Sequence, residues 1–265
     1  MAFCYVVTAL ALIALALILY SLIEKGIGGL NTRVFTMATP AAGSPGGLLN
    51  AIVGSIMLCA LAMAIALLIG VMAGTWLSEY AGESRYGAVV RFLNDVLLSA
   101  PSILVGLFVY VILVMPFKSF SGFAGSVALA LLAVPVITRT TEDVLKLQPT
   151  SLRESAVALG TPLWHVVRSV LWKAAASGIV TGALLAFARI SGETAPLLLT
   201  ALNSPFFTWN MAKPMANLPV VIFNFALGPY ADLNQLAWAG ALIIAVSVLT
   251  VTIIARIVSR EQKPS

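Results

Sequence analysis

The chain has 265 residues, of which 60% are hydrophobic and only 9% are charged. Soluble domains carry roughly a quarter charged residues, so this composition excludes a soluble globular protein and predicts an all-α integral membrane protein. The net charge of +5 does not indicate a nucleic-acid partner, because the basic residues are spread between the apolar stretches instead of forming one patch.

Six apolar stretches are each long enough to cross about 30 Å of hydrocarbon at about 1.5 Å per residue, which predicts a six-transmembrane-helix bundle. The first has no basic n-region and no clear cleavage site, so we expect a retained helix and not a signal peptide. The second is too long for a perpendicular span and should tilt or project beyond the bilayer. The stretches run from Ala2 to Ile23, Leu48 to Leu77, Val96 to Phe117, Phe120 to Thr138, Ala174 to Leu197 and Leu236 to Ala255.

Basic residues between the helices predict the orientation, since Lys and Arg stay in the cytoplasm. With a cytoplasmic N-terminus, ten of them lie inside and four outside. Both chain ends should therefore face the cytoplasm across the cell membrane. The inner residues are Arg85, Arg91, Arg139, Lys146, Arg153, Arg168, Lys173, Arg256, Arg260 and Lys263, and the outer ones are Lys25, Arg33, Lys118 and Lys213.

We divide the chain into a first helix with its external loop (residues 1–47), a transmembrane domain (48–258) and a cytoplasmic tail (259–265). Two connections in the domain exceed a simple hairpin: a cytoplasmic one at 139–173 and an external one at 196–235. Long connections in a compact protein are usually functional. The external one carries Phe206, Phe207 and Trp209, which fit equally an interfacial aromatic belt or a lid with a docking surface.

Two glycine pairs, Gly70 with Gly74 and Gly178 with Gly182, have the i, i+4 spacing of close helix contacts. Apolar sequence this rich in glycine also produces such spacings by chance. The two cysteines, Cys4 and Cys59, fall inside apolar runs and are expected to be reduced thiols, with no disulfide and no metal site.

The cytoplasmic connection predicts two short helices joined at a glycine. Ser151 and Glu154 have the spacing of a capping box, which should start the first helix, and Gly160 should end it. Thr161 is then expected to cap a second helix with Pro162 in its first turn. The result is a rigid elbow that projects from the membrane.

The elbow resembles the EAA motif of ABC importer permeases, through Glu154, Ser155 and Ala156 followed by Gly160. In that family the loop forms a coupling helix that sits in a cleft of the nucleotide-binding subunit. The resemblance therefore implies the type I ABC importer permease fold, and it assigns coupling to a partner ATPase to these four residues and Thr161.

The motif usually closes with Leu-Pro, but Trp172 and Lys173 occupy those positions here. Without the proline, the kink at the start of the fifth helix stays an open question.

No phosphate-binding loop of the form G-x-x-x-x-G-K-[S/T] occurs in the chain. We therefore expect a non-catalytic subunit that binds no cofactor itself, with ATP and Mg²⁺ held by the partner ATPase.

Arg189 and Glu193 lie deep in the fifth apolar stretch, where ionised side chains normally face a bundle interior or a water-filled path. Their i, i+4 spacing predicts a shared helix face. A guanidinium can hold an oxyanion through two parallel hydrogen bonds, so Arg189 is the candidate anion receptor. The alternative is an ion pair that ties this helix to a neighbour without touching a substrate.

The segment from Ala188 to Leu197 closely resembles the signature of the phosphate-specific (Pst) permeases, particularly their PstA subunits, and it includes Thr194. The resemblance places Arg189, Glu193 and Thr194 on the path of inorganic phosphate. It implies a PstC-like permease as the other half of the channel, two PstB-like ATPase subunits and a PstS-like phosphate-binding protein. Further matching motifs are Glu79-Tyr80-Ala81, Pro101-Ser102-Ile103, Gly106-Leu107-Phe108 and Leu218-Pro219 with Ile222.

The role of Glu193 remains open between two explanations. It either holds Arg189 in place until substrate arrives, or accepts a hydrogen bond from protonated phosphate, which sulfate cannot offer at neutral pH. Two other functions also remain: an ABC permease for another oxyanion or a phosphonate, and an ATP-independent secondary transporter.

Overall fold

The computed structural model describes residues 1–261, and within them every regular element is helical. Four helices are long and apolar enough to cross a membrane, and two bent pairs raise the number to six if each pair is one span. This agrees with the predicted bundle. The long helices are α1 (Ala2–Gly29), α3 (Leu49–Glu79), α7 (Gly122–Lys146) and α14 (Ala231–Glu261).

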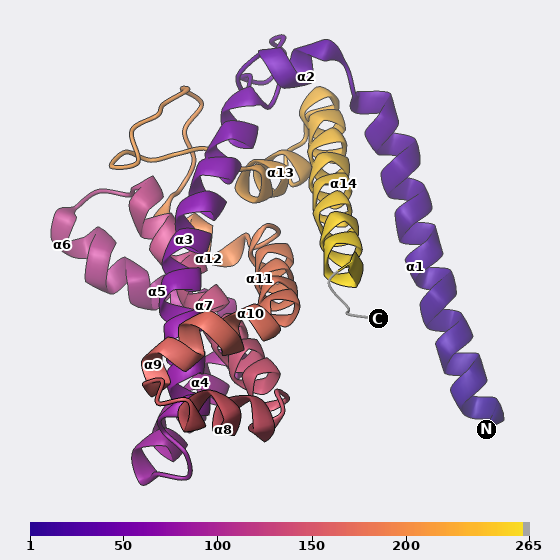
Figure 1. The fold of residues 1–265 in the computed structure, drawn as a ribbon. Coiled ribbons are helices and arrows are strands. Elements are labelled where there is room, and N and C mark those ends of the chain that lie inside the picture. The colour runs from indigo at the N-terminus through magenta and orange to yellow at the C-terminus, as the bar shows by residue number, and fades with distance from the viewer. Residues whose placement is uncertain (262–265) are drawn as a thin grey trace.

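The shorter elements connect and flank these four helices (Figure 1). They are α2 (Thr32–Thr36), α4 (Arg85–Ser99), α5 (Ser102–Val109), the π-helical turn η1 (Tyr110–Val114), α6 (Met115–Phe117), α8 (Thr150–Ala158), α9 (Leu163–Val166), the π-helical turn η2 (Val167–Leu171), α10 (Trp172–Ala174), α11 (Ala176–Ile190), α12 (Ala195–Thr200) and α13 (Leu218–Ala226).

The centre of the bundle is the contact between α3 and α7, which is the most extensive helix pair. Gly70 and Gly74 of α3 allow it: a Cβ at Gly74 would lie 2.5 Å from the carbonyl oxygen of Thr138. Gly178 and Gly182 of α11 lie equally close to side chains of α7. Both predicted glycine pairs therefore mark real helix contacts, where small residues let dispersion forces act between close backbones.

Helix α1 contacts the rest of the chain mainly through α14, near the end of α1 that leads into α2 (Figure 1). The Lys25 ammonium lies 5.0 Å from the ring centroid of Trp238, and Gln235 donates a 2.9 Å hydrogen bond to the carbonyl of Gly28. None of the apolar window of α1 is buried in the single chain. Most of α1 is therefore available to lipid or to another protein.

The third predicted span is wrong at its start. Residues 96–99 belong to α4, and the helix that begins at Ser102 is bent from α4 by 105°. The cause is Pro101, which forces Ala100 into an extended conformation with ψ of 135° and interrupts the helix. The predicted stretch is therefore a bent pair, in which α5, η1 and α6 follow the bend.

The fifth predicted span is wrong at its end. Helix α11 stops at Ile190, and a separate helix, α12, begins at Ala195 with Pro196 in its first turn. Proline cannot donate the backbone hydrogen bond that would continue the earlier helix. Pro196 instead packs against α5, where a Cβ at Gly106 would lie 2.6 Å from its Cα.

The two ends of the bundle differ in what they carry (Figure 1). Helices α4, α8 and α9 gather at the end where α1 begins, and α2 lies at the opposite end. Helix α14 runs away from α2, as the predicted topology requires, and stays helical to Glu261. Part of the predicted tail is thus helical, and residues 262–265, including Lys263, lie outside the described residues. Cys4 and Cys59 are both free.

Candidate functional site

The elbow consists of a first arm, α8, and a second arm formed by α9, η2 and α10. Gly160 joins them with a positive φ of 76°, a conformation that glycine adopts without steric cost. Glu154, Ser155 and Gly160 are exposed, while Ala156 and Thr161 are half-buried. The predicted order of helix, glycine corner and helix is confirmed.

Both predicted helix caps are wrong. Helix α8 starts at Thr150 after Pro149, and α9 starts after Pro162, in each case without a side-chain cap hydrogen bond. Ser151 therefore lies in the first turn, and Thr161 lies before the cap position. The prolines start these helices instead: the carbonyl of Pro149 accepts from the N–H of Leu152 at 3.2 Å.

The start of the fifth helix is bent although the family's proline is absent. The second arm and α11 meet at 73°, at Ala175, and η2 precedes the bend. The indole N–H of Trp172 donates a 3.0 Å hydrogen bond to the hydroxyl of Thr75 in α3. Trp172 thus attaches the segment before the bend to α3.

The elbow end of the bundle contains ion pairs that the sequence did not predict. The guanidinium of Arg153 forms an ion pair with the carboxylate of Glu79 at 2.8 Å. Hydrogen bonding to Glu79 is the chief cause that raises the pKa of Arg153 above its ordinary value. Arg91 binds Glu142, which Lys146 also contacts. The only sequence signal was indirect: Glu79 stands in a family motif, and Arg153 and Lys146 counted only as basic residues.

Arg189 and Glu193 do not share a helix face, contrary to the prediction. Arg189 lies in the last turn of α11 and is exposed, whereas Glu193 lies in the break that follows and is half-buried, like Thr194. The two side chains form no ion pair in the part of the chain that the structure describes. The exposed guanidinium therefore keeps its donors available for an anion or a partner.

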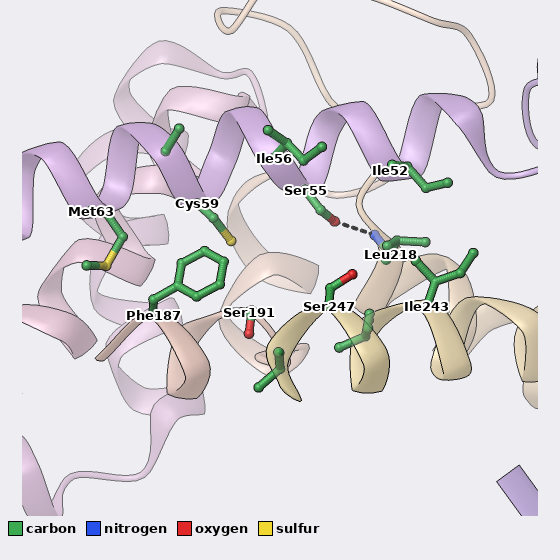
Figure 2. Close-up of a pocket in the computed structure, with 13 residues that line it drawn as sticks. Ile52, Ser55, Ile56, Cys59, Met63, Phe187, Ser191, Leu218, Ile243 and Ser247 are labelled. Carbon is green, nitrogen blue, oxygen red and sulfur yellow. Dashed lines mark hydrogen bonds between the residues drawn. The ribbon is translucent and has the colours of Figure 1, made fainter. Parts of the chain in front are cut away.

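A cavity of about 310 Å³ lies between α3, α11, α14 and the start of α13 (Figure 2). Phe187 of α11 and Ser191, directly after α11, line the cavity, but Arg189, between them in the sequence, does not. The wall is apolar except for the hydroxyls of Ser55, Ser191 and Ser247. Without a charged donor the cavity does not suit an oxyanion, so we do not place the anion path there.

The external connection is partly irregular and partly helical. Phe206 and Trp209 are exposed, by 78% and 67%, and the ring of Phe207 packs edge-on against Trp209 with centroids 5.2 Å apart. The start of α13 is buried, including Leu218 and Val221. These observations leave both predicted roles, aromatic belt and docking surface, open for the exposed aromatics.

Solved structures share this fold. An inward-facing structure of the MetNI methionine ABC transporter matches 82% of this chain and 96% of its own, with a TM-score of 0.68 and 17% identity. A bacterial alginate ABC transporter, solved with a periplasmic protein bound to an alginate pentasaccharide, matches 98% and 94%, with a TM-score of 0.70 and 13% identity. These matches show that the chain has the fold of the type I ABC importer permeases.

Sequence comparison narrows this class. Residues 66–264 match the family described as "Binding-protein-dependent transport system inner membrane component". The phosphate transport system permease protein PstA of Haemophilus influenzae is 51% identical over 98% of this chain and 92% of its own length. PstA of Yersinia pestis is 52% identical over 93% and 84%. The chain belongs to the PstA family of binding-protein-dependent permeases.

Proposed function

We propose that this chain is the permease subunit of an ATP-driven importer of inorganic phosphate and forms one half of its channel. The observation that carries the proposal is the 51% identity to a PstA permease over nearly the whole chain, because so long a match includes the segment around Arg189. The exposed guanidinium of Arg189 supports the same substrate, since it can bind an oxyanion through two hydrogen bonds.

The partners in this proposal are a PstC-like permease, two PstB-like ATPase subunits and a PstS-like phosphate-binding protein. Exposed apolar side chains on the elbow support an ATPase contact: Leu159 is 85% exposed and Trp164 is 61% exposed. Leu159 lies between the coupling residues Glu154, Ser155 and Ala156 and the coupling residues Gly160 and Thr161, and Trp164 follows them. The chain itself is a transport component, and ATP and Mg²⁺ belong to the ATPase subunits.

The orientation in this proposal is the one expected from the charges, with both chain ends and the elbow in the cytoplasm. The ion pairs of Arg91, Lys146 and Arg153 all belong to the elbow end, which agrees with an excess of basic residues inside. The binding protein would then approach the opposite end, which carries α2 and the external connection.

On the substrate path we place Arg189, Glu193 and Thr194. The PstC-like partner would cover the exposed face of α11 and complete the path, since one guanidinium neutralises only part of the charge of phosphate. Because Glu193 does not pair with Arg189 in this structure, we favour its role as an acceptor for the hydroxyl of protonated phosphate.

The decisive experiment reconstitutes the four kinds of subunit in liposomes and follows labelled phosphate. We expect uptake that requires ATP and the loaded binding protein, and that falls at least tenfold in Arg189→Gln while the complex still assembles. Uptake without the ATPase would identify a secondary transporter. ATP-dependent uptake of sulfate or a phosphonate in preference to phosphate would identify another ABC permease.

A further inference from the structure

We propose that α3 links the elbow to the external connection, with Arg153 and Trp172 as positioning residues at one end and Asn50 at the other. The consequence for transport depends on the proposed importer function. The link itself is built from hydrogen bonds between segments that lie far apart in the sequence.

Arg153 is the first attachment. Its Nε and Nη2 donate to the two carboxylate oxygens of Glu79 at 2.9 and 2.8 Å, in the parallel arrangement that carboxylates bind most specifically. The same guanidinium donates to the carbonyls of Gln148 and Leu145, at 2.8 and 2.7 Å, where α7 ends. One side chain therefore joins α8 to both α3 and α7.

Because the side chain of Glu79 is buried, separating it from Arg153 would be costly. Its side chain is 3% exposed, and the hydroxyl of Ser78 also donates to it at 2.7 Å. A buried carboxylate without its cationic partner is strongly destabilising. The first arm thus cannot leave α3 without exposing or protonating Glu79, so the two move together.

Trp172 is the second attachment and comes from the other arm. Its indole N–H donates to Thr75, whose hydroxyl in turn donates to the carbonyl of Val71 at 2.7 Å. Thr75 and Glu79 are four residues apart in α3 and therefore lie on the same face. Both arms of the elbow are held at one place, while Glu154 remains exposed on the outside of α8.

The far end of α3 holds the external connection. The buried amide of Asn50 donates to the carbonyl of Ser204 at 3.1 Å and accepts from the N–H of Thr39 at 2.9 Å. One turn further along α3, the hydroxyl of Ser55 accepts a 2.8 Å hydrogen bond from the N–H of Leu218. The segment that leads into α13 is thus fastened to α3 at two points.

Helix α3 is 31 residues long and has no proline, so it spans about 45 Å as one unbroken helix. A displacement of the elbow by a partner therefore acts on the external connection through α3. The reverse also holds: a protein that docks on the external connection biases the position of the elbow.

The test uses the complete complex and measures how far the phosphate-loaded binding protein stimulates ATP hydrolysis. Trp172→Phe removes one N–H at the elbow end, and Asn50→Ala removes the amide at the external end. We expect each to reduce stimulation about fivefold while basal hydrolysis and assembly stay unchanged. The double variant should be no worse than either single variant, because both interrupt the same link.

Two matched substitutions control for local effects. Trp76→Phe changes a tryptophan at the elbow end of α3, next to Thr75. Its indole N–H makes no hydrogen bond in the described part of the chain. Asn210→Ala removes an amide that caps its own loop and does not reach α3. Both should keep normal stimulation.

Substitutions at distant, independent sites normally add in free energy, so their fold-effects on stimulation multiply. If the effects of Trp172→Phe and Asn50→Ala multiply, or if the controls lose as much stimulation, α3 is not the link. As an independent check, Glu79→Arg should abolish coupling and Arg153→Glu in the same chain should restore part of it. Failure to restore any would contradict the first attachment. A wild-type complex that neither hydrolyses ATP nor takes up phosphate would instead overturn the proposed function.

Discussion

Arg91 and Glu142 join α4 to α7 through an ion pair in which Arg91 Nε lies 2.6 Å from Glu142 Oε1. The carboxylate is 2% exposed, and Lys146 also binds it from one turn further along α7. Arg91 additionally donates to the carbonyls of Gly82 and Leu77, where α3 turns into α4. It therefore holds three segments together at the elbow end.

The two cations of this cluster should differ in their effect on stability. Arg91→Met breaks a largely buried pair and two backbone contacts, so we expect a loss of about 3 kcal/mol in the free energy of unfolding. Lys146→Met should cost less than about 1 kcal/mol, because that ammonium is 50% exposed and its attraction to Glu142 is screened by water. Unfolding of the purified chain in detergent measures both, and equal losses would contradict the geometry.

Gly74→Ala should destabilise the contact between α3 and α7. The new methyl would meet the backbone oxygen of Thr138, which cannot move aside as a flexible side chain can, so we expect a cost of about 1–3 kcal/mol. The matched control is Gly28→Ala in α1, where a Cβ meets nothing within 4 Å. There the helix propensity of alanine should add up to about 1 kcal/mol. Thermal unfolding of the isolated chain compares the two, and a neutral Gly74→Ala would refute the close contact.

Gly160→Val should uncouple ATP hydrolysis from phosphate uptake. At a φ of 76° a β-branched residue is strained, so the angle between the two arms of the elbow must change. The measurement is the number of phosphate ions imported per ATP in the reconstituted complex, which should fall several-fold while the subunits still assemble. Gly160→Asn, which tolerates this conformation better, should keep most of the coupling. A normal ratio in Gly160→Val would remove the elbow from the mechanism.

Glu193→Gln should weaken discrimination between phosphate and sulfate. The amide keeps the size of the side chain. A carboxylate only accepts hydrogen bonds, such as one from the phosphate hydroxyl, whereas the amide NH₂ group donates them. We expect slower phosphate uptake and measurable competition by sulfate, followed with labelled phosphate. If Glu193→Gln transports phosphate at the normal rate and still rejects sulfate, Glu193 does not select phosphate by accepting a hydrogen bond from its hydroxyl.

Sequence reasoning worked best for the long apolar helices and for glycine. Length and hydrophobicity decide whether a helix spans the bilayer, and neither depends on its neighbours, so the existence of α1, α3, α7 and α14 was predicted correctly. Both ends of α3 and the starts of α1 and α7 lie within two residues of the prediction, whereas the other four ends extend five to eight residues beyond the apolar stretches. Gly160 was predicted correctly because a positive φ is a local property. Two of the predicted spans were wrong where proline interrupts an apolar run, at Pro101 and Pro196, since hydropathy does not register a missing backbone donor.

The amino-acid sequence by itself determined that this is a membrane protein of six spans with an elbow, because hydrocarbon thickness, helix rise and glycine conformation act on each segment separately. Only the tertiary structure decided what the elbow is attached to. Arg153 and Glu79 are 74 residues apart, and Trp172 and Thr75 are 97 apart, so no local pattern relates them. The close crossing of α3 and α7 brings these groups together, and a buried carboxylate then requires its guanidinium partner.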